Sequence, residues 1–230
     1  MKKALVLVLM LAVVLTTACC FAACNPDTPD NGGGNGGGGA TMGDAGNMSG
    51  SGYSYPWHDF SAGAVSTDWY KDVLFIGDSR VDGLRIYCPK GGAHYFCKTA
   101  LNVFNVLDTT GYDYRTRLDD LLNNYTYGKI YIAFGINEAG YDLDYFANAY
   151  RNVVNHVRAK QPNAVIILQS VLPVTENYCR HGEYFRPYNL EKRSQAIAGM
   201  ANGYNIFYVN PNPYFTNASG YLYSDTTSDG

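Results

Sequence analysis

Apolar positions along the chain form two patterns, short continuous runs and longer stretches in which they recur every three or four residues. The continuous runs predict buried strands over 73–76, 129–134, 164–168 and 205–209, with a weaker candidate over 95–100. The recurring positions predict helices over 80–86, 113–124, 143–160 and 187–202. Strands that alternate with helices predict a central parallel sheet with helices on both faces, a three-layer α/β/α sandwich.

The amino-terminal residues have the pattern of an export signal. Lys2 and Lys3 precede an apolar run over 4–15, which is too short to span a bilayer comfortably. Residues 21–24, Phe-Ala-Ala-Cys, resemble a bacterial lipoprotein cleavage site, so we expect residues 1–24 to be a signal peptide and Cys24 to carry a lipid. An ordinary secretory signal, cut after Ala22 or Ala23, remains the alternative.

A flexible linker is expected over residues 25–52, because glycine, asparagine, serine and proline leave almost nothing to bury. A coil of this length reaches on the order of 30 Å, enough to hold a domain clear of a membrane. We expect residues 53–230 to form one globular domain, exported and held at the bacterial cell surface by its lipid anchor.

The composition limits the partners of this domain. The chain has 230 residues, 47% of them hydrophobic and 16% charged, which is enough for one sizeable core. A formal net charge of −3 gives no support for nucleic acid binding. The 21 tyrosines are typical of surfaces that meet sugars or proteins, although many also belong in cores and sheets.

Candidate chemistry lies where two of the predicted strands end. The first strand stops at Gly77-Asp78-Ser79, and a glycine there lets the chain turn sharply at the sheet's carboxyl edge. Asp78 is expected to hold the turn by accepting hydrogen bonds from backbone amides. The strand over 129–134 ends in Gly135-Ile136-Asn137-Glu138, so the Asn137 amide lands on the same edge and can donate to a negative oxygen.

These two blocks, with the terminal Asp229-Gly230, resemble the SGNH, or GDSL-type, hydrolase family over roughly residues 70 to 230. The resemblance implies a flavodoxin-like sandwich and no cofactor or metal. It also implies that Ser79 is the nucleophile and that the Ser79 and Ala100 N–H groups and the Asn137 amide hold the oxyanion. Ala100 stands where the family has a glycine.

Asp229 matches the aspartate of the family's final Asp-x-x-His, whose histidine would fall at the second position past Gly230. We therefore expect the printed chain to be truncated before that histidine and the closing helix, and to turn over poorly by itself. Ser79 is not followed two residues later by the glycine of a Gly-x-Ser-x-Gly nucleophile elbow, which argues against the α/β-hydrolase fold.

Histidines and cysteines leave several alternatives open. His181, with Arg180 and Tyr184, lies in a loop expected to rim the active edge, where it contacts substrate, replaces the missing base or is simply solvated. His94 shares those alternatives, while His58 and His156 are expected to be structural or solvated. Cys88, Cys97 and Cys179 are an odd number, so a Cys88–Cys97 disulfide stays open. No cysteine or histidine spacing indicates a metal site.

The sequence thus predicts an exported serine esterase that hydrolyses short O-acetyl-type esters on a cell-wall or dietary polysaccharide. Two alternatives remain. One is a surface module that binds glycan without catalysis, and the other is an acyltransferase that passes the acyl group to a sugar.

Overall fold

The computed structural model of this protein describes residues 66–225 and residue 227. The expected signal peptide, linker and Cys24 lie outside the described residues, as do His58 and Asp229.

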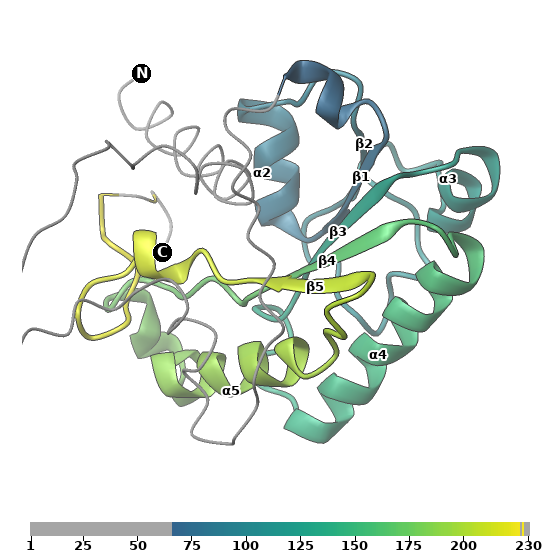
Figure 1. Cartoon of the computed structure of the whole chain (residues 1–230). Helices are drawn as coiled ribbons and strands as arrows, with labels where there is room; N and C mark the ends of the chain where they lie inside the picture. The colour runs from purple at the N-terminus through teal and green to yellow at the C-terminus, as the bar shows by residue number, and fades with distance from the viewer. Residues whose placement is uncertain (1–65, 226, 228–230) are drawn as a thin grey trace, which may run out of the picture.

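Five parallel strands form the central sheet, in the order β2-β1-β3-β4-β5 (Figure 1). Every strand is only four or five residues long, and β1 and the middle of β3 and β4 are buried. Their bounds are β1 Val73–Gly77, β2 His94–Cys97, β3 Lys129–Ala133, β4 Val165–Gln169 and β5 Ile206–Val209.

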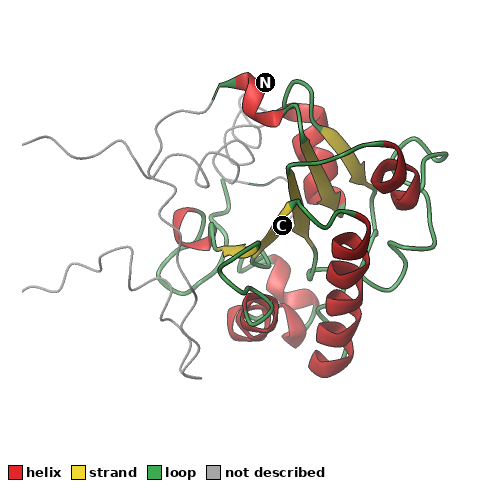
Figure 2. Ribbon diagram, turned by 45° about the vertical axis from the view of Figure 1, so that its right-hand side comes forward, coloured by secondary structure: helices red, strands yellow, loops and turns green. Residues whose placement is uncertain are grey.

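Helices cover both faces of this sheet, as the two views show (Figures 1 and 2). The α-helices are α2 Ser79–Tyr87, α3 Leu118–Asn124, α4 Leu143–Lys160 and α5 Pro187–Ala198. Short 3-10 turns add η2 Thr67–Tyr70, η3 Tyr178–His181, η4 Glu183–Phe185 and η5 Asn212–Tyr214. Among the described helices, none combines the length and the apolar character needed to cross a membrane.

Alternation of side chains along each strand divides the core into two clusters. Leu74 and Ile76 of β1 join the cluster that packs under α3, α4 and α5. Val73 and Phe75 face the other way and join the cluster under α2. The predicted three-layer α/β/α sandwich is therefore confirmed, with α2 on one face and α3, α4 and α5 on the other.

The predicted helix over 113–124 begins five residues late, at Leu118. Asp113 explains the difference, because its Oδ1 accepts from the N–H groups of Arg115 at 3.0 Å and Thr116 at 2.9 Å and so forms a local turn. An antiparallel bridge between Thr110 and Arg117 closes this turn directly before the helix. The strand expected over 95–100 is likewise displaced, to His94–Cys97, and α5 ends at Ala198 rather than at 202.

The strand order places a topological switch point at the carboxyl end of β1. From β1 the chain moves to one neighbour, β2, and then crosses to β3 on the other side. Loops that leave adjacent strands in opposite directions open a crevice between them, where open α/β sheets bind ligands. The loops after β1, β2 and β3 are therefore the ones to search for a site.

Candidate active site

Three strands end level with one another at the switch point. Gly77, the last residue of β1, pairs with Cys97 of β2 and Ala133 of β3. Ser79 follows two residues later on its loop, Ala100 three and Asn137 four, and all three are exposed. The sheet thus brings the predicted nucleophile and both predicted oxyanion donors from other loops to one edge.

Ser79 is the first residue of α2, and Asp78 is its N-cap. The Asp78 Oδ1 accepts a hydrogen bond from the Arg80 N–H at 2.9 Å, which confirms the expected role of this carboxylate in the turn. Burial raises the pKa of Asp78, while the nearby Arg80 charge and N–H oppose that shift. The predicted nucleophile therefore starts a helix at a capped turn.

Gly77 is needed for space rather than for its backbone freedom. A Cβ at this position would lie 2.3 Å from Val81 Cγ2 and 2.7 Å from the Ala133 carbonyl oxygen. Its φ is not in the left-handed region, so the close approach of Val81 and Ala133, and not a positive φ, is what requires a glycine here. The missing side chain lets α2 pack directly against the ends of β1 and β3, which fixes Ser79 in place.

Ala100 adopts the backbone conformation that a glycine would favour, with a φ of +61°. The Asn102 amide donates to the Ala100 carbonyl at 3.1 Å, and the Leu101 N–H donates to the Lys98 carbonyl at 3.1 Å. These contacts hold the turn, so the alanine keeps the local geometry at the cost of backbone strain.

Asn137 is held by the neighbouring loop. One hydrogen of its amide is donated to the Leu101 carbonyl at 2.9 Å, which leaves the second amide hydrogen for another acceptor. Gly135 precedes it with a φ of +134°, and a Cβ there would lie 2.3 Å from Val171 Cγ2. Both glycine-specific features fix the direction in which the loop leaves β3.

Glu138 was given no role by the sequence, and it is fully buried beneath this edge. Its Oε1 accepts from the Val103 N–H at 2.7 Å, which ties the loop after β3 to the loop after β2. Burial raises the pKa of Glu138 to about 7; the Val103 N–H opposes the shift and the Asp78 charge adds to it. Only tertiary packing reveals this residue, because a glutamate beside an asparagine is unremarkable in sequence.

Arg80 joins the turn that carries Ser79 to the loop after β4. Its guanidinium donates to the carbonyls of Leu172 and, at 3.1 Å, Pro173. One residue further, the Val174 carbonyl accepts from the Leu222 N–H at 2.9 Å. The segment that leads toward Asp229 therefore reaches the same edge of the sheet as Ser79.

The histidines separate by position. His181 ends η3, in the loop after β4, and is exposed with its ring centroid 5.0 Å from that of Tyr178. His94 begins β2, at the opposite edge of the sheet, where its Nδ1 lies 2.7 Å from the Tyr127 hydroxyl. His94 is therefore not a base for Ser79.

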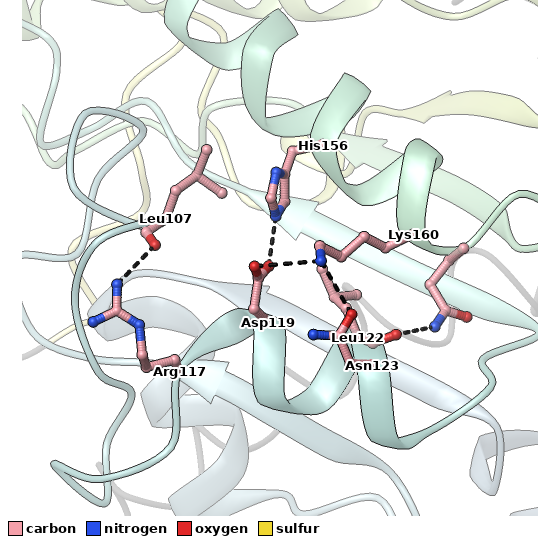
Figure 3. A network of polar contacts seen from close by, with 8 residues as sticks. Leu107, Arg117, Asp119, Leu122, Asn123, His156 and Lys160 are labelled. Atoms are coloured by element: carbon pink, nitrogen blue, oxygen red, sulfur yellow. Dashed lines mark hydrogen bonds and ion pairs between the residues drawn. The ribbon is translucent and has the colours of Figure 1, made fainter.

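His156 is structural, as expected. Its Nε2 lies 2.5 Å from Asp119 Oδ1, and Lys160 Nζ lies 3.4 Å from Asp119 Oδ2 (Figure 3). Lys160 also donates to Asn123 at 3.0 Å. The contacts link α3 to α4 on the flank of the sandwich.

The three cysteines that the structure describes are free thiols, so it contains no Cys88–Cys97 disulfide. Burial raises the pKa of Cys97 to about 12, and the adjacent Asp82 charge adds to the shift, so this thiol is a poor nucleophile. Across residues 66–225 and 227, no group of three or more side chains is arranged to hold a metal ion.

The sequence matches the GDSL-like Lipase/Acylhydrolase family over residues 75–230, a span that contains every site residue placed above. The chain belongs to this family. This membership makes the protein a hydrolase of the esterase and acylhydrolase class, and it agrees with the resemblance carried by residues 77–79 and 135–138. A search of curated proteins gives no match.

Solved structures of other proteins share the fold. A structure assigned as a platelet activating factor from Streptococcus pneumonia is 22% identical, with a TM-score of 0.54 over 71% of this chain and 81% of that one. A structure assigned as an acylhydrolase from Bacteroides fragilis is 16% identical, with a TM-score of 0.53 over 70% of this chain and 77% of that one. At these identities the likeness shows the α/β sandwich alone.

Proposed function

We propose that this family member is an exported serine esterase that removes short acyl groups, of the O-acetyl type, from a polysaccharide. One observation carries the proposal: Ser79 begins a capped helix at the switch point, on the edge where Ala100 and Asn137 are also exposed. A serine hydroxyl beside fixed N–H donors fits acyl transfer.

In the proposed reaction, Ser79 Oγ attacks the ester carbonyl while a base takes its proton. The N–H groups of Ser79 and Ala100 and the free hydrogen of the Asn137 amide hold the negative oxygen of the tetrahedral intermediate. Collapse of this intermediate releases the sugar hydroxyl, which takes the proton, and leaves Ser79 acylated. Water then attacks the acyl-serine, releases the carboxylic acid and restores the hydroxyl.

The base belongs to the family's final block, in which Asp229 stands as the aspartate that orients a histidine. The contact between Leu222 and Val174 supports this role, because it holds the segment before Asp229 at the active edge. Arg180, His181 and Tyr184, all exposed on the loop after β4, are proposed to contact the substrate.

The test of the reaction is release of free acetate from acetylated xylan by the protein purified after expression of its whole gene. We expect Ser79→Ala to lower the rate at least a thousandfold. His181→Ala, a matched loop variant, should lower it by less than tenfold. Transfer of acetate to an added sugar without free acetate would instead identify an acyltransferase, and an unchanged rate in Ser79→Ala would remove the proposed nucleophile.

Export and anchoring at Cys24 form a separate proposal, supported by the apolar run over 4–15 and the small residues before the cysteine. Metabolic labelling with a fatty acid in a bacterial host is expected to mark the wild-type protein and not Cys24→Ser. Equal labelling of the two proteins would contradict it.

A further inference from the structure

Three aromatic rings gather on two loops at the candidate site and on the helix that follows the second loop. Phe104 follows β2, Tyr141 follows β3, and Tyr145 lies in the first turn of α4. The centroid of Phe104 lies 4.8 Å from that of Tyr141 and 4.7 Å from that of Tyr145, with the Phe104 and Tyr145 rings inclined by only 16°. We call these three residues the aromatic trio.

The trio is exposed although its rings pack on one another. Tyr141 keeps 53% of its surface and Tyr145 keeps 57%, while Phe104 is half-buried beneath them. Stacking on Phe104 covers one side of the Tyr145 ring and leaves solvent-accessible surface beyond it. Phe104 therefore acts as a support for two accessible phenol rings.

The loops that carry the trio are the loops that carry the predicted oxyanion donors. Asn137 binds the Leu101 carbonyl, and Glu138 binds the Val103 N–H, so residues 101–104 and 137–141 form one unit. The buried Arg193 of α5 fixes this unit further by donating to the Tyr141 carbonyl at 2.5 Å. The rings are thus held at a set position relative to Ala100 and Asn137.

A second group of rings continues the surface along the same edge. Gly140 faces the Tyr184 ring, since a Cβ at Gly140 would lie 3.9 Å from three of its atoms. The Tyr184 centroid lies 4.6 Å from that of Phe185, which in turn lies 5.2 Å from that of Tyr178. Tyr184 is 42% exposed.

The chemistry of this surface favours a sugar chain. Tyrosine rings offer flat apolar faces with hydroxyl groups at their rims, which match the flat C–H faces and peripheral hydroxyls of a pyranose. Their stiff side chains lose little conformational entropy on binding, which favours recognition of a repeated ring. A β-1,4-linked glycan is a flat ribbon of this kind and can follow a row of rings.

We propose that the aromatic trio, continued by Tyr184, is a stacking subsite for an unmodified β-1,4-linked sugar chain beside the acylated sugar. This inference rests on the proposed esterase function, because it supplies the polymer contact that such an enzyme needs. It also explains how a site made of exposed residues can hold an extended substrate before the ester reaches Ser79.

The test is binding of xylohexaose and cellohexaose, neither of them acetylated, to the Ser79→Ala protein by calorimetry. We expect one of them to bind, and we expect Tyr145→Ala in that background to weaken binding by about tenfold, as loss of a stacked ring typically does. Tyr145→Phe keeps the ring and should bind within about threefold of the parent, because only the hydroxyl is lost.

Tyr204→Ala is the matched control, because Tyr204 is 84% exposed in the turn that enters β5, at the other edge of the sheet. Binding lost equally in Tyr145→Ala and Tyr204→Ala, or binding of neither hexaose, overturns the subsite. Association with phosphatidylcholine vesicles that needs Tyr145, in place of hexaose binding, would also overturn it. Catalysis plays no part in these measurements, so absence of esterase activity refutes the proposed reaction without changing their outcome.

Discussion

At the scale of single residues, Ala100 carries a strain that its neighbours do not remove. Its φ of +61° costs an L-residue about 1 kcal/mol or more relative to glycine. We therefore predict that Ala100→Gly raises the free energy of unfolding by about 1 kcal/mol, measured by urea denaturation.

Ala149→Gly, within α4, is the control for that change. There the same substitution meets ordinary helical geometry and should lower stability by about 1 kcal/mol. If both substitutions destabilise the protein alike, the positive φ of Ala100 carries no strain.

Glu138 gives the molecule a pH dependence whose sign follows from its burial. Its pKa of about 7 in the folded protein exceeds the value of about 4.3 expected in the unfolded chain. Between these values the folded state binds more protons than the unfolded state, so stability falls as pH rises from about 4 to 7. The predicted loss is on the order of 3 kcal/mol.

Glu138→Gln removes this titration and keeps an oxygen that accepts from the Val103 N–H. We expect the difference in unfolding free energy between the two proteins to grow in favour of the variant from pH 4 to pH 7. If the difference in unfolding free energy between the two proteins does not change with pH, the pKa of the buried Glu138 carboxyl is not raised.

At the scale of elements, contact between α2 and the sheet depends on Gly77. Gly77→Ala should lower stability by about 2 kcal/mol, because its Cβ meets both Val81 and the Ala133 carbonyl. Val81→Ala added to it should restore only part of the loss, since the backbone carbonyl remains. Urea denaturation measures both effects.

Gly83→Ala, in the same helix, provides the comparison for Gly77. A Cβ at Gly83 meets nothing within 4 Å, so the change should stabilise α2 by about 1 kcal/mol. Destabilisation of similar size at both glycines would show that helix geometry, rather than close packing at Gly77, sets the cost.

His156 tests the contact between α3 and α4. The pair with Asp119 is half-exposed, so His156→Ala should cost about 1 kcal/mol of stability and leave esterase activity unchanged. Asn155→Ala, at the exposed neighbouring position, should cost less. A large loss of activity in His156→Ala at full stability would contradict its structural role.

The sequence predicted most elements because their apolar patterns are strong. Val73 to Ile76 are buried on both faces, and the helix over 143–160 carries a regular stripe, so both were found within a residue. The apolar pattern wrongly extended the helix over 113–117. There Asp113 accepts hydrogen bonds from nearby backbone amides, and the spacing of apolar residues gives no information on such bonds. Strand order was also beyond the pattern, since it is set by crossovers.

At the scale of the whole molecule, the site could be predicted only in part. Ser79 and Asn137 follow glycines at strand ends, and parallel strands must bring such ends to one edge. Glu138, Arg193 and the aromatic trio act through contacts between loops far apart in the chain. Such contacts leave no signal in a single sequence, so they emerged only from the fold.

The proposed reaction depends above all on Ser79 as the nucleophile. The test is to incubate the protein, expressed from its whole gene, with a fluorophosphonate, which phosphonylates activated serines, and to map the modified peptide by mass spectrometry. We expect a single adduct on Ser79 that is lost in Ser79→Ala and forms more slowly in Asn137→Ala. An adduct on another serine, or equal labelling of wild type and Ser79→Ala, would contradict it.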